Sequence, residues 1–291
     1  MTLHQLTTGH VRAVVRLPEH LDTAAARAAA RFLPGGWHLG EPGASEGLAA
    51  VEIAIGTADV TADADTVRIR LPHDSAVSAS LAYLTYTALE RVRQRRGKVT
   101  VHATALVPPD GRAVLLLGDK GAGKTTTALA LAERGWVHAG DDLVVLAEED
   151  GGQVAVWPGK PTAAVREPHA PLAPKHVLDL APFAASPAPL GWVVRLAVHP
   201  GRTSALRPAV PLSVNEGLRL HELLTRYLSG LPTPLAGVGA VPYGPVWPLD
   251  APALARWRSH LISRLAAGRF DYLYAPDAHA AAELLAKEAA G

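Results

Sequence analysis

A glycine-rich loop between an apolar run and a helical segment is the feature that constrains the fold of this chain most. Residues 118–125 have the sequence Gly-Asp-Lys-Gly-Ala-Gly-Lys-Thr and fit the phosphate-binding pattern G-x-x-x-x-G-K-[ST]. The apolar residues 113–117 predict a buried strand, and the Ala- and Leu-rich residues 126–134 predict a helix that ends at Gly135. A strand, a loop and a helix in this order direct backbone N–H groups and a helix N-terminus toward an anion. A chance glycine-rich turn is the alternative, and the correct flanks on both sides argue against it.

The pattern assigns an expected contact to each part of the loop. Lys124 is expected to reach the β- and γ-phosphates of a nucleotide, and the Thr125 hydroxyl is expected to hold Mg²⁺. The candidate nucleotide-binding residues are Gly118, Asp119, Lys120, Gly121, Ala122, Gly123, Lys124, Thr125 and Thr126. The sequence therefore predicts ATP and Mg²⁺ as ligands, with the choice between ATP and GTP left open.

An acidic pair, Asp141-Asp142, follows sixteen positions after Thr125. This spacing leaves room for one helix and one short strand, but not for a further βαβ unit of roughly 30 residues. By pattern the pair lies within an extended stretch, where two adjacent carboxylates are costly unless they hold a cation or a proton. A solvated acidic turn is the alternative. We expect an acidic site whose charge a Mg²⁺–nucleotide complex would compensate.

His102 is the third candidate site residue, within a strand predicted over residues 98–107. On such a strand it would share a face with Thr100 and Thr104. Taken alone, a strand histidine is more often structural than catalytic. The other histidines are scattered and show no metal-ligand spacing.

The remaining segments predict an α/β organisation. The further predicted strands cover residues 11–17, 51–55, 66–71, 193–198 and 270–274, and the predicted helices cover 76–95, 212–228, 253–267 and 278–289. A strand over 98–107 followed by one over 113–117 predicts a hairpin that leads into the loop. Residues 158–191 are expected to wrap the core as loops, and residues 230–250 to form a long loop. We expect an N-terminal α/β portion over residues 1–97 and a nucleotide-binding domain over residues 98–291.

Composition excludes several classes of protein and site. The chain has no cysteine, which excludes disulfides, thiolate metal sites and cysteine nucleophiles. Its formal net charge of +1 gives no nucleic-acid signature. No apolar run is long enough to span a bilayer, and residues 1–20 lack the apolar core of a signal peptide. We expect a cytoplasmic protein that binds neither nucleic acid nor membrane, and the sequence leaves homo-oligomer formation open.

Taken in order, these motifs resemble the kinase core of the bacterial HPr kinase/phosphorylase family, which is structurally akin to phosphoenolpyruvate carboxykinase. The resemblance covers roughly residues 99–147. It rests on Val101-His102-Ala103-Thr104-Ala105, the loop with its strand, Leu129-Ala130-Leu131, Arg134-Gly135 and Ala139-Gly140-Asp141-Asp142. It implies a P-loop kinase core with a mixed sheet flanked by helices, joined here to the N-terminal α/β portion.

The resemblance also implies roles for the candidate residues. His102 would line the active site, Lys124 would bind the phosphates, and the acidic pair would supply a metal ligand and the base that takes the proton from a hydroxyl group. We favour Asp141 as the base, and we favour Asp142, with Thr125, as the metal ligand, while the order of the two aspartates stays open. Further positive charge at the nucleotide could come from Arg166, Lys175, Arg195 or Arg202, each of which could equally be a surface residue.

Two departures from the family bear on the acceptor. Lys120 and Thr126 stand where the HPr enzymes usually have serine and glutamate, and their downstream Asn-Ile-Arg-Gly signature is missing. HPr is therefore not the expected acceptor. We expect an ATP-dependent phosphotransferase that phosphorylates a serine of a peptide or protein, or a small hydroxylated metabolite, in bacterial natural-product biosynthesis. The alternatives are a nucleotide-hydrolysing regulatory switch, with water as the acceptor, and a nucleotide-binding scaffold without turnover.

Overall fold

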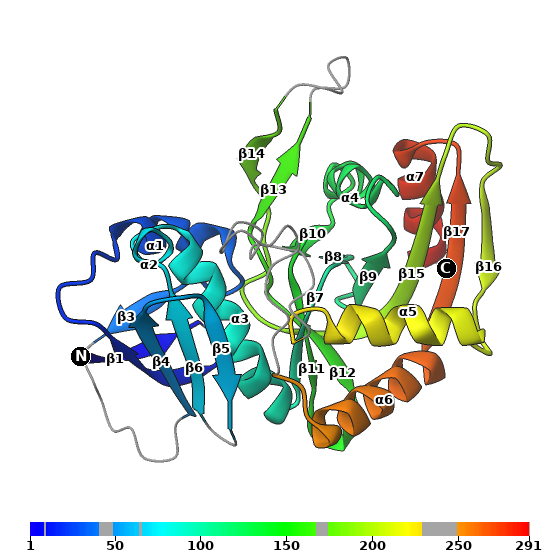
Figure 1. The fold of residues 1–291 in the computed structure, drawn as a ribbon. Helices are drawn as coiled ribbons and strands as arrows, with labels where there is room; N and C mark the ends of the chain where they lie inside the picture. Colours follow the sequence, from blue (N-terminus) through cyan, green and yellow to red (C-terminus); the bar gives the residue numbers. More distant parts are fainter. Residues whose placement is uncertain (9, 41–48, 64–65, 167–173, 229–248, 291) are drawn as a thin grey trace. The chain divides into compact units, whose positions relative to one another are not determined.

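The chain forms two compact units in the computed structural model, and each unit has its own mixed sheet (Figure 1). The structure describes residues 1–8, 10–40, 49–63, 66–166, 174–228 and 249–290. The first unit comprises Met1–Val99 and Glu222–Arg258, and the second comprises Thr100–His221 and Ser259–Gly291. Within the predicted domain 98–291, the described residues 222–228 and 249–258 belong to the first unit.

The first unit is built on a six-stranded sheet with the strand order β3-β1-β2-β4-β6-β5. Strand β4 runs parallel to β2 and β6, and the other neighbours are antiparallel. The strands are β1 (Thr2–Thr7), β2 (Arg12–Leu17), β3 (His38–Gly40), β4 (Ala49–Ile55), β5 (Asp59–Ala62) and β6 (Thr66–Leu71). Along β6, Val67, Ile69 and Leu71 are buried while Arg68 and Arg70 are exposed. The alternation of apolar and charged residues in the sequence therefore predicts correctly which face of β6 is buried.

The helices of the first unit correct one prediction. They are α1 (Ala24–Ala29) with a following 3₁₀ turn (Ala30–Phe32), α2 (His73–Ala76) and α3 (Ser80–Arg95). The single helix predicted over residues 76–95 is wrong at its start. Ser78 Oγ donates to the Ser75 carbonyl at 2.9 Å and accepts from the Ser80 N–H at 3.1 Å. Because serine side chains compete for backbone groups in this way, the chain ends one short helix before it begins the next.

The second unit contains most of a nine-stranded sheet. Its main path has the order β10-β8-β9-β15-β12-β11-β7, and β17 pairs with β15 and with the edge strand β16. The strands are β7 (Lys98–Val101), β8 (Thr104–Val107), β9 (Ala113–Leu117), β10 (Val137–Gly140), β11 (Val144–Glu148), β12 (Val154–Trp157), β15 (Ala188–Val198), β16 (Ala205–Pro208) and β17 (Arg269–Ala275). β9 runs parallel to β15, and β15 runs parallel to β17.

Two helices cover one face of this sheet. α4 (Lys124–Ala132) and α7 (Ala278–Ala289) lie side by side next to the sheet (Figure 1) and share an apolar core with its strands. Val114 and Leu116 of β9 and Val194 and Leu196 of β15 belong to that core. The sequence predicts α7 with its correct bounds, and Asp277 caps it by accepting the Ala280 N–H at 2.8 Å. Two further helices, α5 (Val214–Thr225) and α6 (Pro252–Ala267), each begin in one unit and end in the other.

The structure corrects the predicted strand over residues 98–107. It is divided into β7 and β8, with His102 and Ala103 between them. The two halves pair with different strands, β7 with β11 and β8 with β9 and β10, so one continuous strand cannot serve both. The predicted hairpin is confirmed for β8 and β9, which are antiparallel.

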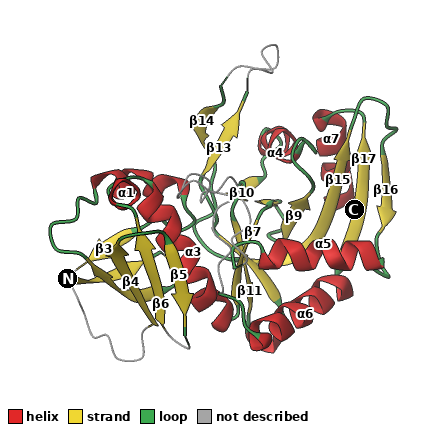
Figure 2. Ribbon diagram, viewed as in Figure 1, coloured by secondary structure: helices red, strands yellow, loops and turns green. Residues whose placement is uncertain are grey.

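Residues 158–191, predicted as loops, also contain strands. β13 (Thr162–Val165) and β14 (His176–Asp179) form a two-stranded antiparallel ribbon separate from the large sheet (Figure 2), and β15 begins at Ala188. Weak periodicity hides such short segments, because each side of a ribbon buries few residues. Residues 230–250, predicted as a long loop, lie largely outside the described residues. In the described part of the chain, no helix combines the length and the apolar character needed to cross a membrane.

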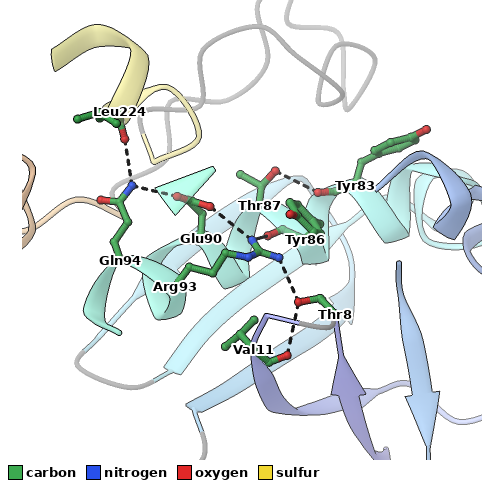
Figure 3. A network of polar contacts seen from close by, with 9 residues as sticks. All are labelled: Thr8, Val11, Tyr83, Tyr86, Thr87, Glu90, Arg93, Gln94 and Leu224. Carbon is green, nitrogen blue, oxygen red and sulfur yellow. Dashed lines mark hydrogen bonds and ion pairs between the residues drawn. The ribbon is translucent and has the colours of Figure 1, made fainter. Parts of the chain in front are cut away.

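A buried polar network holds α3 in the first unit (Figure 3). Arg93 is buried over the Tyr86 ring, 3.6 Å from its centroid, and pairs with Glu90 at 3.4 Å. Gln94 donates to Glu90 at 3.1 Å and to the Leu224 carbonyl at 3.0 Å, and it accepts from Arg258 at 2.8 Å. Glu90, Arg93, Gln94 and Arg258 are all nearly inaccessible to solvent. Their mutual pairing is what makes these buried charges tolerable.

We expect Glu90→Ala to destabilise the protein by about 3–5 kcal/mol, because it leaves the Arg93 guanidinium buried without its carboxylate. The matched control is Arg16→Ala. Arg16 pairs with Glu52 at 2.7 Å on an exposed sheet face, and such a pair contributes roughly 1 kcal/mol or less. Urea denaturation followed by circular dichroism measures the free energy of unfolding of both variants and of the wild type. Equal, small losses in the two variants would contradict a stabilising role for the buried network.

Candidate functional site

The glycine-rich loop has the arrangement that its sequence predicts. It connects the end of β9 to the start of α4, and the backbone dihedral angle φ is +87° at Gly121 and +86° at Gly123. These values fall in the left-handed region, which glycine adopts most readily. A Cβ atom at position 123 would also lie 3.1 Å from carbon atoms of Val198 on β15. Gly123 is therefore required both by its φ angle and by the neighbouring strand.

Lys124 lies back over the loop that precedes it. Its Nζ donates to the Gly118 carbonyl at 2.7 Å and to the Asp119 carbonyl at 3.2 Å. Burial lowers the pKa of Lys124, while the charges of Asp141, Asp142 and Asp119 act in the opposite direction. The ammonium group is therefore oriented by the loop and lies near the acidic pair.

Asp141 is the point at which three elements meet. It follows the last residue of β10 and is 2 % exposed. Thr104 of β8 donates its hydroxyl to Asp141 Oδ1 at 2.6 Å, and the Thr125 hydroxyl of α4 lies 3.0 and 3.2 Å from the two carboxylate oxygens. Burial raises the pKa of Asp141 and the charge of Asp142 raises it further, against the hydroxyl bonds and Lys160. The carboxylate is directed at the first turn of α4.

Asp142 has a different environment from its neighbour. Its φ is +64°, and its side chain is 43 % exposed. Lys160 Nζ lies 3.1 Å from Asp142 Oδ2, and His102 Nδ1 lies 4.0 Å from Oδ1. Burial alone would raise the pKa of Asp142, but Lys160, His102 and Lys175 outweigh it and hold the pKa below its ordinary value. The pair does not lie within a strand, as the sequence predicts, but at the turn between β10 and β11. The turn directs the two carboxylates into different surroundings.

Lys160 is a site residue that the sequence analysis missed. Its loop packs against the acidic turn through three backbone hydrogen bonds. These bonds run from Gly159 to the Ala139 carbonyl at 2.6 Å, from Lys160 to the Leu143 carbonyl at 2.7 Å, and from Asp141 to the Lys160 carbonyl at 3.2 Å. The local sequence Gly-Lys-Pro at 159–161 marks a tight loop. Nothing in the sequence indicates that this loop meets Asp142, because the two are 18 positions apart.

The other predicted cationic residues lie in several environments. Arg195 of β15 pairs with the carboxylate of Glu216, which is 1 % exposed and also accepts from the Tyr272 hydroxyl at 3.1 Å. Lys175 contributes charge near Asp142. Arg166 is exposed, and so is Arg202, which stacks over the Tyr274 ring at 5.4 Å. Of the loop residues, Asp119, Lys120, Gly121 and Thr126 are exposed.

The acidic site has few protein ligands for a metal ion. In the described ranges, no group of three or more His, Asp or Glu side chains could hold one. Mg²⁺ fits such a site, because it binds through one or two carboxylates together with substrate phosphates and water. The Asp141 carboxylate and the Thr125 hydroxyl, 3.0 Å apart, are the adjacent oxygen groups at the start of α4. This donor set suits Mg²⁺ when it is bound to a nucleotide.

Comparisons with known proteins add little to this geometry. No protein-family model and no curated protein matches the chain. Among solved structures, the chain is similar to the Hpr(Ser) kinase/phosphatase from Coxiella burnetii, with 18 % identity and a TM-score of 0.26. The match covers 36 % of this chain and 76 % of that one. A likeness of this size carries no functional argument.

The two aspartates should affect stability in opposite directions. The raised pKa of Asp141 means that its ionised form is disfavoured in the folded protein, so this group costs stability as the pH rises from the unfolded toward the folded pKa. The lowered pKa of Asp142 means that its ionised form stabilises the fold above the unfolded pKa, and that this contribution is lost in acid. At neutral pH we expect Asp141→Asn to raise the Tm of the ligand-free protein and Asp142→Asn to lower it.

Differential scanning fluorimetry from acidic to neutral pH measures this contrast. Asparagine tolerates a positive φ, so the substitution at position 142 adds little backbone strain. The Tm difference between each variant and the wild type should shrink as the pH falls through the ordinary aspartate pKa near ~3.9. A lower Tm for Asp141→Asn at neutral pH would contradict the cost of burying its charge.

Proposed function

We propose that this protein is an ATP-dependent kinase that transfers the γ-phosphoryl group to a hydroxyl group of a serine in a peptide or protein, or of a small hydroxylated metabolite. The observation that carries the proposal is the contrast within the acidic pair: Asp141 is buried against Thr125 at the loop–helix junction, and Asp142 faces solvent beside two basic side chains. The motif resemblance over residues 99–147 supports a divergent relative of the HPr kinase/phosphorylase family.

On the nucleotide side, the loop amides and Lys124 would bind the phosphates. Lys124 already lies over the loop, 2.7 Å from the Gly118 carbonyl, so it needs only a local shift to reach a phosphate oxygen. Asp141 and Thr125 would hold Mg²⁺, which neutralises phosphate charge when it is bound with the nucleotide. Phosphoryl transfer demands chiefly such positioning and charge stabilisation.

On the acceptor side, Asp142 would orient the hydroxyl group and take its proton. The bond between the γ-phosphorus and the β,γ-bridging oxygen breaks while the acceptor oxygen bonds to phosphorus. The acceptor proton passes to the Asp142 carboxylate, and ADP leaves. This order of roles reverses the one favoured from the sequence. It is supported by burial, because the Asp141 oxygens accept from two threonine hydroxyls while Asp142 is open to a substrate. His102, 4.0 Å from Asp142, would orient that carboxylate.

We expect Lys124→Ala to lower phosphoryl transfer by ~100-fold or more and to leave the fold intact, because the lysine acts on phosphate charge. The matched control is Lys287→Ala, on the exposed face of α7. The assay incubates the protein with ATP·Mg²⁺ and serine peptides or small alcohols, and mass spectrometry detects the added phosphoryl group. If ATP hydrolysis is equally fast without an acceptor and no phosphorylated product forms, the protein is a nucleotide-hydrolysing switch instead.

We expect the two asparagine variants to fail at different steps. Asp142→Asn should bind ATP·Mg²⁺ with nearly normal affinity and lose transfer by ~100-fold or more, as expected when a general base is removed. Asp141→Asn should weaken Mg²⁺-dependent nucleotide binding by about tenfold or more, because it loses an ionic metal ligand. Calorimetry with ATP·Mg²⁺, paired with the transfer assay, separates the two. If Asp141→Asn instead loses transfer and Asp142→Asn loses binding, Asp141 is the base and Asp142 the metal ligand, as favoured from the sequence. Wild-type behaviour of both variants would remove the acidic pair from the mechanism.

A further inference from the structure

Lys160 is a buried lysine whose partner is open to solvent. The residue is 9 % exposed, whereas the side chain of Asp142, 3.1 Å from its Nζ, is 43 % exposed. An ammonium group carries three donors, and within the described residues its hydrogen bond goes to Asp142. Burying such a charge is costly unless it is paired and hydrogen-bonded. Because the Asp142 side of this pair is open to solvent, a further anionic group can approach the Lys160 ammonium from there.

Backbone hydrogen bonds hold the short loop that carries Lys160. Besides the three hydrogen bonds to the acidic turn, the Leu180 N–H donates to the Pro161 carbonyl at 2.9 Å. Gly159 allows the close approach, because a Cβ atom there would lie 2.3 Å from the Leu143 carbonyl oxygen. The loop is therefore held on one side by the acidic turn that carries Asp141 and Asp142 and on the other by Leu180, which follows β14. Such support is typical of a group that is positioned before its ligand binds.

Lys160 and Lys124 approach the acidic pair from different elements. Lys124 belongs to the first turn of α4, and Lys160 to the loop between β12 and β13. Arg195, a partly buried cation near Lys124, pairs with the buried carboxylate of Glu216. Lys160 pairs instead with the carboxylate that faces the acceptor in the proposed reaction. Its position matches the need for positive charge around the oxygens of the transferred phosphoryl group.

We propose that Lys160 is a second phosphoryl-binding lysine, which contacts the transferred group from the acceptor side while Lys124 contacts it from the nucleotide side. This inference rests on the proposed kinase function. The experiment uses the full chain and compares the binding of ADP·Mg²⁺ with and without beryllium fluoride, which takes the place of the γ-phosphoryl group. Isothermal titration calorimetry then gives the gain in affinity that the γ-position contributes.

For the wild type and for the exposed control Lys287→Met, we expect the fluoride to increase the affinity for ADP·Mg²⁺ strongly. For Lys160→Met we expect unchanged affinity for ADP·Mg²⁺ and a gain from fluoride that is reduced about tenfold or more, the size expected for one hydrogen bond to a charged group. Lys160→Arg should keep most of the gain, because it retains the charge.

The alternative outcomes are distinct. An undiminished gain in Lys160→Met overturns the inference and leaves the kinase proposal intact. A parallel loss of affinity for ADP·Mg²⁺ with and without fluoride assigns Lys160 a structural role only, which also overturns the inference. If the wild type does not bind ADP·Mg²⁺ at all, the proposed function fails, and the role of Lys160 fails with it.

Discussion

The hydrogen-bonded carboxylate of Asp141 is the interaction on which the site of the second unit depends. Its two oxygens accept hydroxyl groups from Thr104 on β8 and from Thr125 on α4. Because a charge this deeply buried is tolerated only when it is hydrogen-bonded, these bonds fix the start of α4 relative to the strands. The glycine-rich loop, the β8–β9 hairpin and the end of β10 are thereby joined at one residue.

In this site, the charges of Asp141 and Lys124 are only partly compensated by neighbouring groups. Burial raises the pKa of Asp141 and lowers the pKa of Lys124, so the ionised form of each is disfavoured relative to water. Opposed shifts of this kind on neighbouring groups are characteristic of sites that bind charged ligands. In the kinase proposal, Mg²⁺ would compensate the negative charge of Asp141, and the phosphate oxygens would compensate the positive charge of Lys124. In the same proposal, the acceptor would bind beside the open pair of Asp142 and Lys160.

The polar network of the first unit has a different character. Glu90, Arg93, Gln94 and Arg258 are all buried and linked by hydrogen bonds, and Arg258 also pairs with the partly exposed Asp250 at 2.7 Å. Within the first unit, their contacts join α3 to Leu224 and to Arg258, which is 164 positions from Gln94. We expect the network to contribute to stability, while the candidate site residues lie in the second unit.

The sequence by itself determined the elements whose causes are local. Apolar runs and the glycine pattern predict β9, the loop and a following helix, and the helix predicted over residues 278–289 has the bounds of α7. Tertiary structure alone decided the break at His102, the different environments of Asp141 and Asp142, and the position of Lys160. Each depends on which distant backbone groups pair, as when Gly159 meets Ala139 and Lys160 meets Leu143. Periodicity and propensity describe neighbours along the chain, whereas the burial of a carboxylate or an ammonium group is set by elements that meet only after folding.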